Sequence, residues 1–311
     1  MPPLIVIAGA TATGKTALAL ALAERIRGAE IISADSRQVY RGMDIGTAKP
    51  TRRDQATTRH HCLDLVDPDG AFTAATYRRH ALDALRGISE RGGVGLLTGG
   101  TGLYLRIIAR GLPLGEGDAD PAVRAQLEKR LAETGLDPLV TELLGRDAEG
   151  ATSLDLRNPR RVIRALERAI VSGTAAPPKA QGYPAPQTWL GLRLAPDAHR
   201  SAIGSRIEQQ FQAGLLDEAQ RLRERYPEDL PAFSAMGYHE AFDVLAGRSG
   251  IDDAKAADAR RTWSYARRQR TWFASEPGIE WLETGEGVLD RAHAHVAPWL
   301  RRIGHPDYPA Q

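Results

Sequence analysis

The chain has 311 residues, a net charge of +2 and 26% charged residues, which suits one large or two ordinary globular domains. The single cysteine, Cys62, excludes a disulfide framework and a cysteine-rich zinc site, and we expect it to be a small buried residue. No apolar run approaches the ~20 residues that cross a bilayer. The first strand begins too close to Met1 for a signal peptide. We therefore expect a soluble, cytoplasmic protein that does not bind membranes.

Residues 1–115 alternate between apolar β runs and helical segments, which predicts a parallel sheet flanked by helices. The strands are expected at Leu4–Ala8, Glu30–Ala34, Cys62–Val66 and Val94–Thr98, and the helices at Lys15–Arg27 and Ala74–Arg91. Ligands of such sheets lie at the carboxyl ends of the strands. Three polar or glycine-rich segments follow strands here, and we expect them to share one rim: Gly9–Thr16, Asp35-Ser36 and Gly99–Gly102.

The segment Gly9–Thr16 reads GATATGKT and fits G-x-x-x-x-G-K-[ST] between a strand and a helix, the context in which this motif binds phosphate. Backbone N–H groups and the helix N-terminus would surround phosphate oxygens. Lys15 would reach the terminal phosphate, and the Thr16 hydroxyl would bind Mg²⁺. The alternative is a turn without a ligand. We predict that the whole P-loop binds a di- or triphosphate: Gly9, Ala10, Thr11, Ala12, Thr13, Gly14, Lys15 and Thr16.

Two further segments extend this rim. The Asp35 carboxylate could hold Mg²⁺ through water or act as a base, or Asp35 or Ser36 could cap a turn. The strand Val94–Thr98 runs into Gly99–Gly102 instead of ending in the acid that serves ATP hydrolysis. This favours positioning of a phosphate ester over activation of water. Thr101 would contribute its hydroxyl there, or serve only as a turn residue.

Residues 118–187 show helical patterns only, which predicts a small helical insertion in an α/β core of residues 1–117 and 188–311. One helix spans Ala122–Glu133, and Asn158-Pro159 opens another, with the N-cap and N1 residues that helices favour. The second helix has an apolar stripe of Val162, Ile163, Leu166 and Ile170, opposite Arg157, Arg161, Arg164 and Arg168. The returning core is expected as strands Trp189–Leu194 and Ile279–Leu282 and helices Ala198–Phe211, Leu215–Arg225, Tyr238–Ala246, Ile251–Ser275 and Val288–Arg302.

Residues 260–275 contain five arginines and no acid, interleaved with Trp263, Tyr265, Trp272 and Phe273. At helical spacing, Arg261, Tyr265, Arg268 and Trp272 share one face. Arginines beside aromatic rings suit RNA whose bases are unstacked. The alternative is a solvated cationic helix whose aromatic rings belong to the core. With the arginines of 157–168 there are two basic surfaces, which favours a nucleic-acid partner.

These motifs together resemble the tRNA dimethylallyltransferases in their bacterial form, over roughly Ile5 to Leu282. The chain carries them in the family's order: GATATGKT, SADSRQVY (33–40), GMDIGTAKP (42–50), GGTGLY (99–104), NPRRVIRALE (158–167), SAMGYHE (234–240) and RRQRTWF (267–273). A P-loop alone is generic. GMDIGTAKP and SADSRQVY together are highly specific.

The resemblance implies transfer of a dimethylallyl group from its diphosphate to N6 of adenosine 37 in tRNAs that read codons beginning with U, with Mg²⁺. The enzyme would act as a monomer on the anticodon stem-loop. The resemblance places Asp35 as the base, with Thr101 beside the reacting centre and Lys15 on the leaving diphosphate. The base must leave the loop's stack to react. The implied tRNA contacts are Asp35, Ser36, Arg37, Gln38, Thr101, Arg124, Pro159, Arg160, Arg161, Val162, Ile163, Met236, Gly237, Arg267, Arg268 and Arg270.

The chain departs from the family pattern at R-I-x-x-R-F, whose second arginine is expected on the diphosphate. Here that position is Gln210, and about four residues, roughly one helical turn, are missing before Gly214. Arg206 or another arginine would have to substitute, or diphosphate binding is weaker. Ala10 replaces the usual P-loop proline, and with one cysteine the chain lacks the zinc finger of animal and yeast relatives.

Three other functions share parts of this pattern. A P-loop small-molecule kinase would use ATP and close an arginine-rich lid over it, which the helical insertion could mimic. A prenyltransferase acting on free adenine nucleotides would not need the basic surface at Arg260–Arg270. A non-catalytic RNA-binding P-loop protein would not need Asp35 and Thr101 on the rim.

Overall fold

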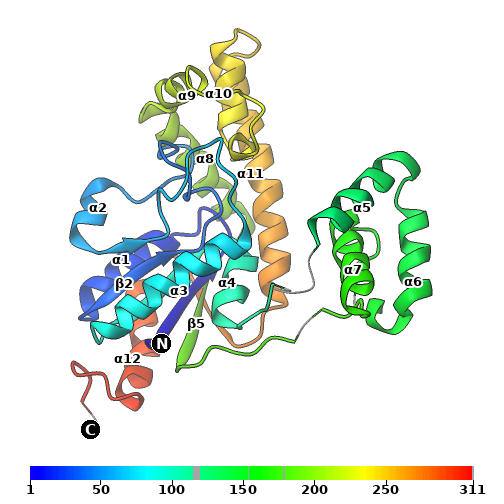
Figure 1. Cartoon of the computed structure of the whole chain (residues 1–311). Helices are drawn as coiled ribbons and strands as arrows, with labels where there is room; N and C mark the ends of the chain where they lie inside the picture. Colours follow the sequence, from blue (N-terminus) through cyan, green and yellow to red (C-terminus); the bar gives the residue numbers. More distant parts are fainter. Residues whose placement is uncertain (115–119, 153, 178, 310–311) are drawn as a thin grey trace. The chain divides into compact units, whose positions relative to one another are not determined.

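The computed structural model describes residues 1–114, 120–152, 154–177 and 179–309. The chain forms two compact units (Figure 1), the larger from Met1–Arg110 and Tyr183–Gln311 and the smaller from Gly111–Gly182. The insertion expected at residues 118–187 therefore lies within a few residues of the smaller unit at each end. Each unit has its own hydrophobic core.

The larger unit is built on a parallel sheet of six strands in the order β3-β2-β4-β1-β5-β6. This confirms the predicted α/β class with a P-loop after the central β1. The strands are β1 (Leu4–Gly9), β2 (Ala29–Ser33), β3 (His60–His61), β4 (Val94–Gly99), β5 (Gln187–Arg193) and β6 (Ile279–Glu283). Every residue of β1 and β4 is buried, as expected for central strands covered on both faces.

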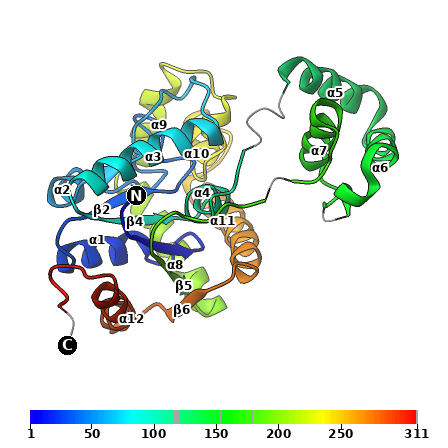
Figure 2. The same cartoon turned by 60° about the horizontal axis from the view of Figure 1, so that its bottom comes forward.

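Helices cover both faces of the sheet, as Figure 2 shows with α3 on one side and α1 and α12 on the other. The core under α1 and α12 contains Ile5 and Leu96 from the sheet, Leu22 from α1 and Val296 from α12. The helices of this unit are α1 (Lys15–Arg25), α2 (Arg52–Thr57), α3 (Ala74–Glu90), α4 (Gly102–Ala109), α8 (Pro196–Gln212), α9 (Leu215–Arg223), α10 (Tyr238–Leu245), α11 (Ile251–Ala274) and α12 (Val288–Arg302). A second core joins α9 and α10 to Val39 and Met43, which follow β2.

The strand predicted at Cys62–Val66 is wrong. The β3 pairing ends at His61, and Cys62 and Asp64 have φ angles of 63° and 53°. These left-handed conformations break an extended strand, and Val66 makes only an isolated bridge to Tyr40. The segment therefore forms a turn in spite of its strand-like apolar pattern. Cys62 is buried, as expected.

Two short helices of the larger unit were not predicted. The α2 helix begins at a capping box, in which Thr51 and Asp54 bond each other's backbone N–H groups. The α4 helix begins directly after the glycine-rich turn, with Thr101 as the N-cap residue. Gly102 lies against the Trp272 ring, and a Cβ there would approach the ring to 2.5 Å. The turn therefore needs glycine for packing.

The smaller unit consists of α5 (Pro121–Thr134), α6 (Asp137–Ala151) and α7 (Pro159–Ser172) around one core. Asn158 caps α7 by accepting from the N–H groups of Arg160 and Arg161, as the sequence predicts. The predicted environments of two α7 residues, Ile170 in the apolar stripe and Arg168 on the opposite face, are wrong. Ile170 is exposed, and Arg168 is buried and donates to the Ala175 carbonyl. The apolar stripe extends through Ala169 because the chain after α7 folds back over that face.

Candidate active site

The P-loop connects β1 to α1 and is fixed by close backbone contacts. Gly9 has a φ of 151°, and a Cβ there would come within 2.7 Å of the Leu192 carbonyl oxygen, so no side chain fits. Gly14, in the left-handed region at φ 85°, precedes the first residue of α1. The Lys15 Nζ donates to the Ala10 carbonyl at 2.6 Å, and the Thr13 hydroxyl donates to the same carbonyl. The loop is thus held in one conformation by its own backbone and side-chain contacts.

Thr11, in the middle of the P-loop, is held by three side chains from α8 and α11. Its N–H donates to Gln269 Oε1 at 2.8 Å, and its hydroxyl accepts from Arg206 Nη1 at 2.7 Å. Its carbonyl lies 2.8 Å from His199 Nε2, which places the ring's proton on that nitrogen. Gln269 also donates to the Gly100 carbonyl and so joins the P-loop to the glycine-rich turn.

A cavity of about 440 Å³ opens beside the P-loop at the carboxyl ends of the strands. The charged side chains that line it are Lys15, Arg206 and Asp35, and Thr16 and Gln38 add polar groups. The structure therefore brings together the predicted phosphate, metal and base residues. The lining also contains polar residues that the sequence analysis did not name as site residues, among them Ser33, His60, Thr98 and Gln209.

Asp35 occupies the rim directly after β2. One of its carboxylate oxygens accepts from the Arg37 N–H at 2.8 Å, an Asx turn. The Thr101 hydroxyl accepts from the Ser36 N–H at 3.1 Å, and the Thr101 N–H donates to Ala34, so the turn after β4 is fixed against the Asp35 segment. Thr101 is next to this wall but does not line the cavity.

Ionisable groups around the cavity have shifted pKa values. Burial lowers the pKa of Lys15 to about 8, with Asp35 opposing the shift and Arg206 adding to it. Burial raises the pKa of Tyr104 and of Tyr265 to about 12, and the charge of Asp35 adds to both shifts. Both phenols therefore stay protonated at neutral pH.

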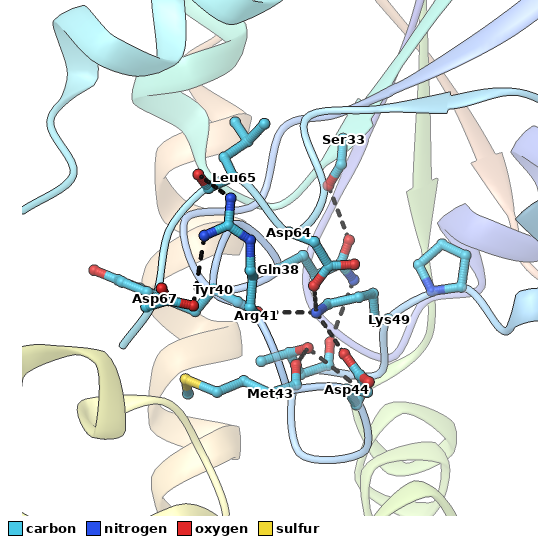
Figure 3. Close-up of polar contacts among 12 residues, drawn as sticks. Ser33, Gln38, Tyr40, Arg41, Met43, Asp44, Lys49, Asp64, Leu65 and Asp67 are labelled. Atoms are coloured by element: carbon cyan, nitrogen blue, oxygen red, sulfur yellow. Dashed lines mark hydrogen bonds and ion pairs between the residues drawn. The ribbon is translucent and has the colours of Figure 1, made fainter. Parts of the chain in front are cut away.

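The opposite wall is the GMDIGTAKP segment, whose irregular backbone is held by buried polar side chains (Figure 3). Lys49, with 2% of its side chain exposed, donates to Asp44 at 2.5 Å, to Asp64 at 2.6 Å and to the Tyr40 carbonyl at 2.9 Å. Gln38 accepts from the Ser33 hydroxyl and donates to the carbonyls at 47 and 48. Gln38 is thus buried and fully engaged in holding this wall.

The carboxylate of Glu218 holds the same segment from the other side. It accepts from the backbone N–H groups of residues 44, 45 and 46 and from the Tyr238 hydroxyl. Lys49 belongs to the GMDIGTAKP motif, but the motif did not indicate which groups it binds. No feature of the sequence singled out Glu218, whose partners at 44–46 are distant in the chain.

The basic surface of α11 is present, but its aromatic rings are largely used within the protein. The guanidinium carbon of Arg106 lies 4.2 Å from the centre of the Trp272 ring, and that of Arg200 lies 4.7 Å from the centre of the Trp263 ring. Phe273 is buried. Arg261 pairs with Glu240. Arg267, Arg268 and Arg270 are exposed and form no ion pair within the described ranges. The arginines, rather than the rings, are available to a partner.

The predicted tRNA contacts in the smaller unit lie in three different environments. Pro159, Arg160 and Arg161 are exposed at the start of α7. The side chains of Val162 and Ile163 are in the core, 0% and 5% exposed, so only their backbone could meet a ligand. Arg124 forms an ion pair with the buried Glu167. In the larger unit, Met236 is half-buried and Gly237 is the N-cap residue of α10, with a φ of 89°. Arg37 donates to the Pro231 carbonyl.

The geometry defines the class of protein: a P-loop α/β protein whose phosphate site shares a cavity with a carboxylate. The sequence model described as IPP transferase matches residues 38–276. A tRNA dimethylallyltransferase of Roseiflexus sp. is 44% identical over 304 residues, covering 96% of this chain and 99% of the relative. One from Bifidobacterium longum subsp. infantis is 39% identical, covering 94% of this chain and 90% of the relative.

Solved structures agree. The tRNA isopentenylpyrophosphate transferase of Bacillus halodurans is 34% identical with a TM-score of 0.72, covering 97% of this chain and 98% of that one. A eukaryotic dimethylallyltransferase acting on tRNA has a TM-score of 0.83 at 22% identity, covering 100% and 81% of the two chains, and supports the fold alone. The chain belongs to the IPP transferase family. The resemblance seen in the sequence is confirmed, and the comparisons favour it over the kinase alternative. Within the described residues, no helix is long and apolar enough to cross a membrane.

Proposed function

We propose that this protein transfers the dimethylallyl group of dimethylallyl diphosphate to N6 of adenosine 37 in tRNAs that read codons beginning with U. The observation that carries the proposal is the shared cavity of the P-loop and Asp35, with exposed arginines on α11. The relatives bear the name tRNA dimethylallyltransferase. We further propose that it acts in the cytoplasm as a monomer.

The diphosphate would bind along the P-loop, from Gly9 to Thr16. Its oxygens would accept from backbone N–H groups at the start of α1, whose helix dipole favours an anion. The Lys15 ammonium, which lines the cavity, would stabilise the charge that develops on the leaving oxygen. Since burial lowers the pKa of Lys15 to about 8, the anion would also help to keep it protonated.

The residues present suit Mg²⁺. The Thr16 hydroxyl and the Asp35 carboxylate line one cavity, and oxygen ligands are those that Mg²⁺ prefers. In the described part of the chain no three acidic, histidine or cysteine residues cluster, so water and the diphosphate would supply the remaining ligands. When bound, the ion would neutralise charge on the diphosphate.

In the reaction, the N6 lone pair forms a bond to C1 of the dimethylallyl group. The C1–O bond breaks and its electron pair leaves with the diphosphate. We assign Asp35 the N6 proton, because its second carboxylate oxygen is not used by the Arg37 N–H. The Thr101 hydroxyl would lie beside the reacting centre, held by the Ser36 N–H.

The tRNA would contact the two basic surfaces, through Arg267, Arg268 and Arg270 on α11 and through Pro159, Arg160 and Arg161 on α7. The Asp35–Gln38 segment and the Met236-Gly237 turn would meet the anticodon loop. Direct base contacts would come from single-stranded nucleotides of the loop. Arg124, in contrast, would support α7 through Glu167.

The test is transfer of label from radiolabelled dimethylallyl diphosphate to an unmodified anticodon stem-loop in the presence of Mg²⁺. Adenosine monophosphate serves as a parallel acceptor. Label in the stem-loop alone supports the proposal. Label in the mononucleotide would instead indicate a prenyltransferase that acts on free nucleotides. If neither acceptor is labelled and the protein transfers phosphate from ATP, the protein is a kinase.

The role of Asp35 gives the first prediction. Asp35→Ala should lower kcat by about 10²- to 10⁴-fold, since it removes the general base. The affinity for the stem-loop should change little. The matched control is Asp67→Ala, which removes an exposed carboxylate outside the cavity. An unchanged kcat for Asp35→Ala would remove the assignment.

A further inference from the structure

Arg206, from the middle of α8, has an unusual environment for an arginine. Its Nη1 donates to the Thr11 hydroxyl, and its Nε is buried without a hydrogen-bond partner. Throughout the described residues, no carboxylate comes within ion-pair distance of it. Burial lowers its pKa, and Asp258 and Asp35 oppose that shift only from a distance.

A buried cation without a paired anion is costly, and proteins usually pair such a group. The guanidinium has five N–H donors, and among the described residues one hydrogen bond uses them, to the Thr11 hydroxyl. Arg206 lines the cavity together with Lys15, and its charge contributes to the lowered pKa of Lys15. An anion bound in the cavity could therefore contact both cations.

Gln210 lies one helical turn further along α8 and has a different task. Its amide group donates to the carbonyls of Ile45 at 2.7 Å and Gly46 at 2.9 Å. Glu218 accepts from the N–H groups of the same two residues. The two side chains thus hold the GMDIGTAKP segment from its carbonyl and amide sides. Gln210 is buried there and does not line the P-loop cavity.

We propose that Arg206 is the second cation of the diphosphate site in this chain, and that Gln210 positions the facing wall. This inference rests on the proposed function and deepens it. Within α8, Arg206 lies on the P-loop side and supplies the positive charge that binds the anion. One turn later, the Gln210 amide donates to the backbone carbonyls of the GMDIGTAKP segment. The planar guanidinium matches the oxygens of a diphosphate in a way that an ammonium does not.

The experiment measures the binding of inorganic pyrophosphate with Mg²⁺ by calorimetry, which needs neither tRNA nor turnover. Arg206→Gln should weaken pyrophosphate binding by about 10- to 100-fold, because a charged hydrogen-bond donor is lost. Arg206→Lys should recover part of the loss. The KM for dimethylallyl diphosphate should rise in parallel, while the affinity for the stem-loop stays unchanged.

Two further variants separate the roles of the two positions. Gln210→Ala should lower the Tm yet keep pyrophosphate affinity within about threefold, since it removes hydrogen bonds of the wall and no anion contact. The exchange Arg206→Gln with Gln210→Arg should not restore pyrophosphate binding. If Arg206→Gln folds to a normal circular dichroism spectrum and binds pyrophosphate like the parent, or if the exchange restores binding, the inference is overturned. If Arg206→Gln does not fold, the pyrophosphate affinity of Arg206→Lys is compared with that of the parent instead, and an equal affinity overturns the inference.

These outcomes are distinct from failure of the proposed function. If the parent protein binds pyrophosphate through Arg206 but labels no stem-loop, the proposed reaction fails and the anion site stands. If the parent labels the stem-loop and Arg206→Gln and Arg206→Lys retain the parent's KM, the reaction stands and the inference fails.

Discussion

The helices α7 and α11 have similar arginine-rich sequences and different surroundings. The α7 helix carries its own acid: Glu167 is fully buried and bonds Arg164 of α7 and Arg124 of α5. In α11 the stretch from 260 to 275 has no acid, and three of its arginines stay exposed without an ion pair in the part of the chain that the structure describes.

The difference shows that an arginine-rich helix face can have two roles, which are to compensate a buried acid or to attract an anionic partner. Arginines that neutralise a buried carboxylate have much of their charge compensated within the protein. Arginines without an acid nearby attract phosphate, and their contribution depends on salt. The presence of Glu167 inside the NPRRVIRALE motif distinguishes the two helices. The three predictions below test this distinction.

The largest effect is expected at Glu167. Glu167→Gln leaves Arg124 and Arg164 without their anion and should lower the free energy of unfolding of the smaller unit by about 3 kcal/mol. This is the lower end of the range for buried pairs because both arginines remain partly solvated. Thermal unfolding followed by circular dichroism measures it. The control is Glu128→Gln, an exposed position on α5. Equal Tm values for the two variants would show that the buried carboxylate does not stabilise α7.

The basic surface of α11 should matter for binding rather than stability. Replacing Arg267, Arg268 and Arg270 together by alanine should weaken stem-loop binding by about 10²-fold at low salt and reduce the slope of log K against log salt by up to about 2. Fluorescence anisotropy across a salt series measures both quantities. A triple variant at Arg27, Arg301 and Arg302 removes the same charge elsewhere in the larger unit. Equal losses in the two triple variants would mean that net charge, and not this surface, attracts the RNA.

The sequence predicted those parts of the site that are local in the chain. The P-loop and the rim position of Asp35 follow from a strand that ends in a polar turn, and the α11 arginines follow from helical spacing. Glu218 and Gln269 could not be predicted in the same way, because their partners lie in segments far along the chain. The partners of Lys49 are nearer, but they follow irregular backbone that no periodic pattern describes. Gln269 had one usable signal: it has helical spacing with Thr262, Ala266 and Phe273, which are among the buried residues of α11, and a glutamine on a buried face needs polar partners.

Errors arose where a tertiary contact overrode a local pattern. The Cys62–Val66 run alternates like a strand, but Asp64 adopts a left-handed turn in which it binds the buried Lys49. Arg168 has the spacing of a surface residue, but the chain after α7 covers it and supplies a carbonyl acceptor. Helical and strand periodicity describe one element at a time and cannot include such contacts.

The smallest expected effect separates Arg124 from Arg160, both of which the sequence predicts as tRNA contacts. Arg160 is exposed and, among the described residues, forms no ion pair, so Arg160→Ala should weaken stem-loop binding by about 2- to 5-fold and lower the salt slope by about 0.7. Arg124 is 38% exposed and bonded to Glu167, so Arg124→Ala should lower the Tm and leave the salt slope unchanged. A reduced slope with an unchanged Tm for Arg124→Ala would mean that this guanidinium leaves Glu167 for a phosphate. The smaller unit would then bind tRNA through both groups of arginines.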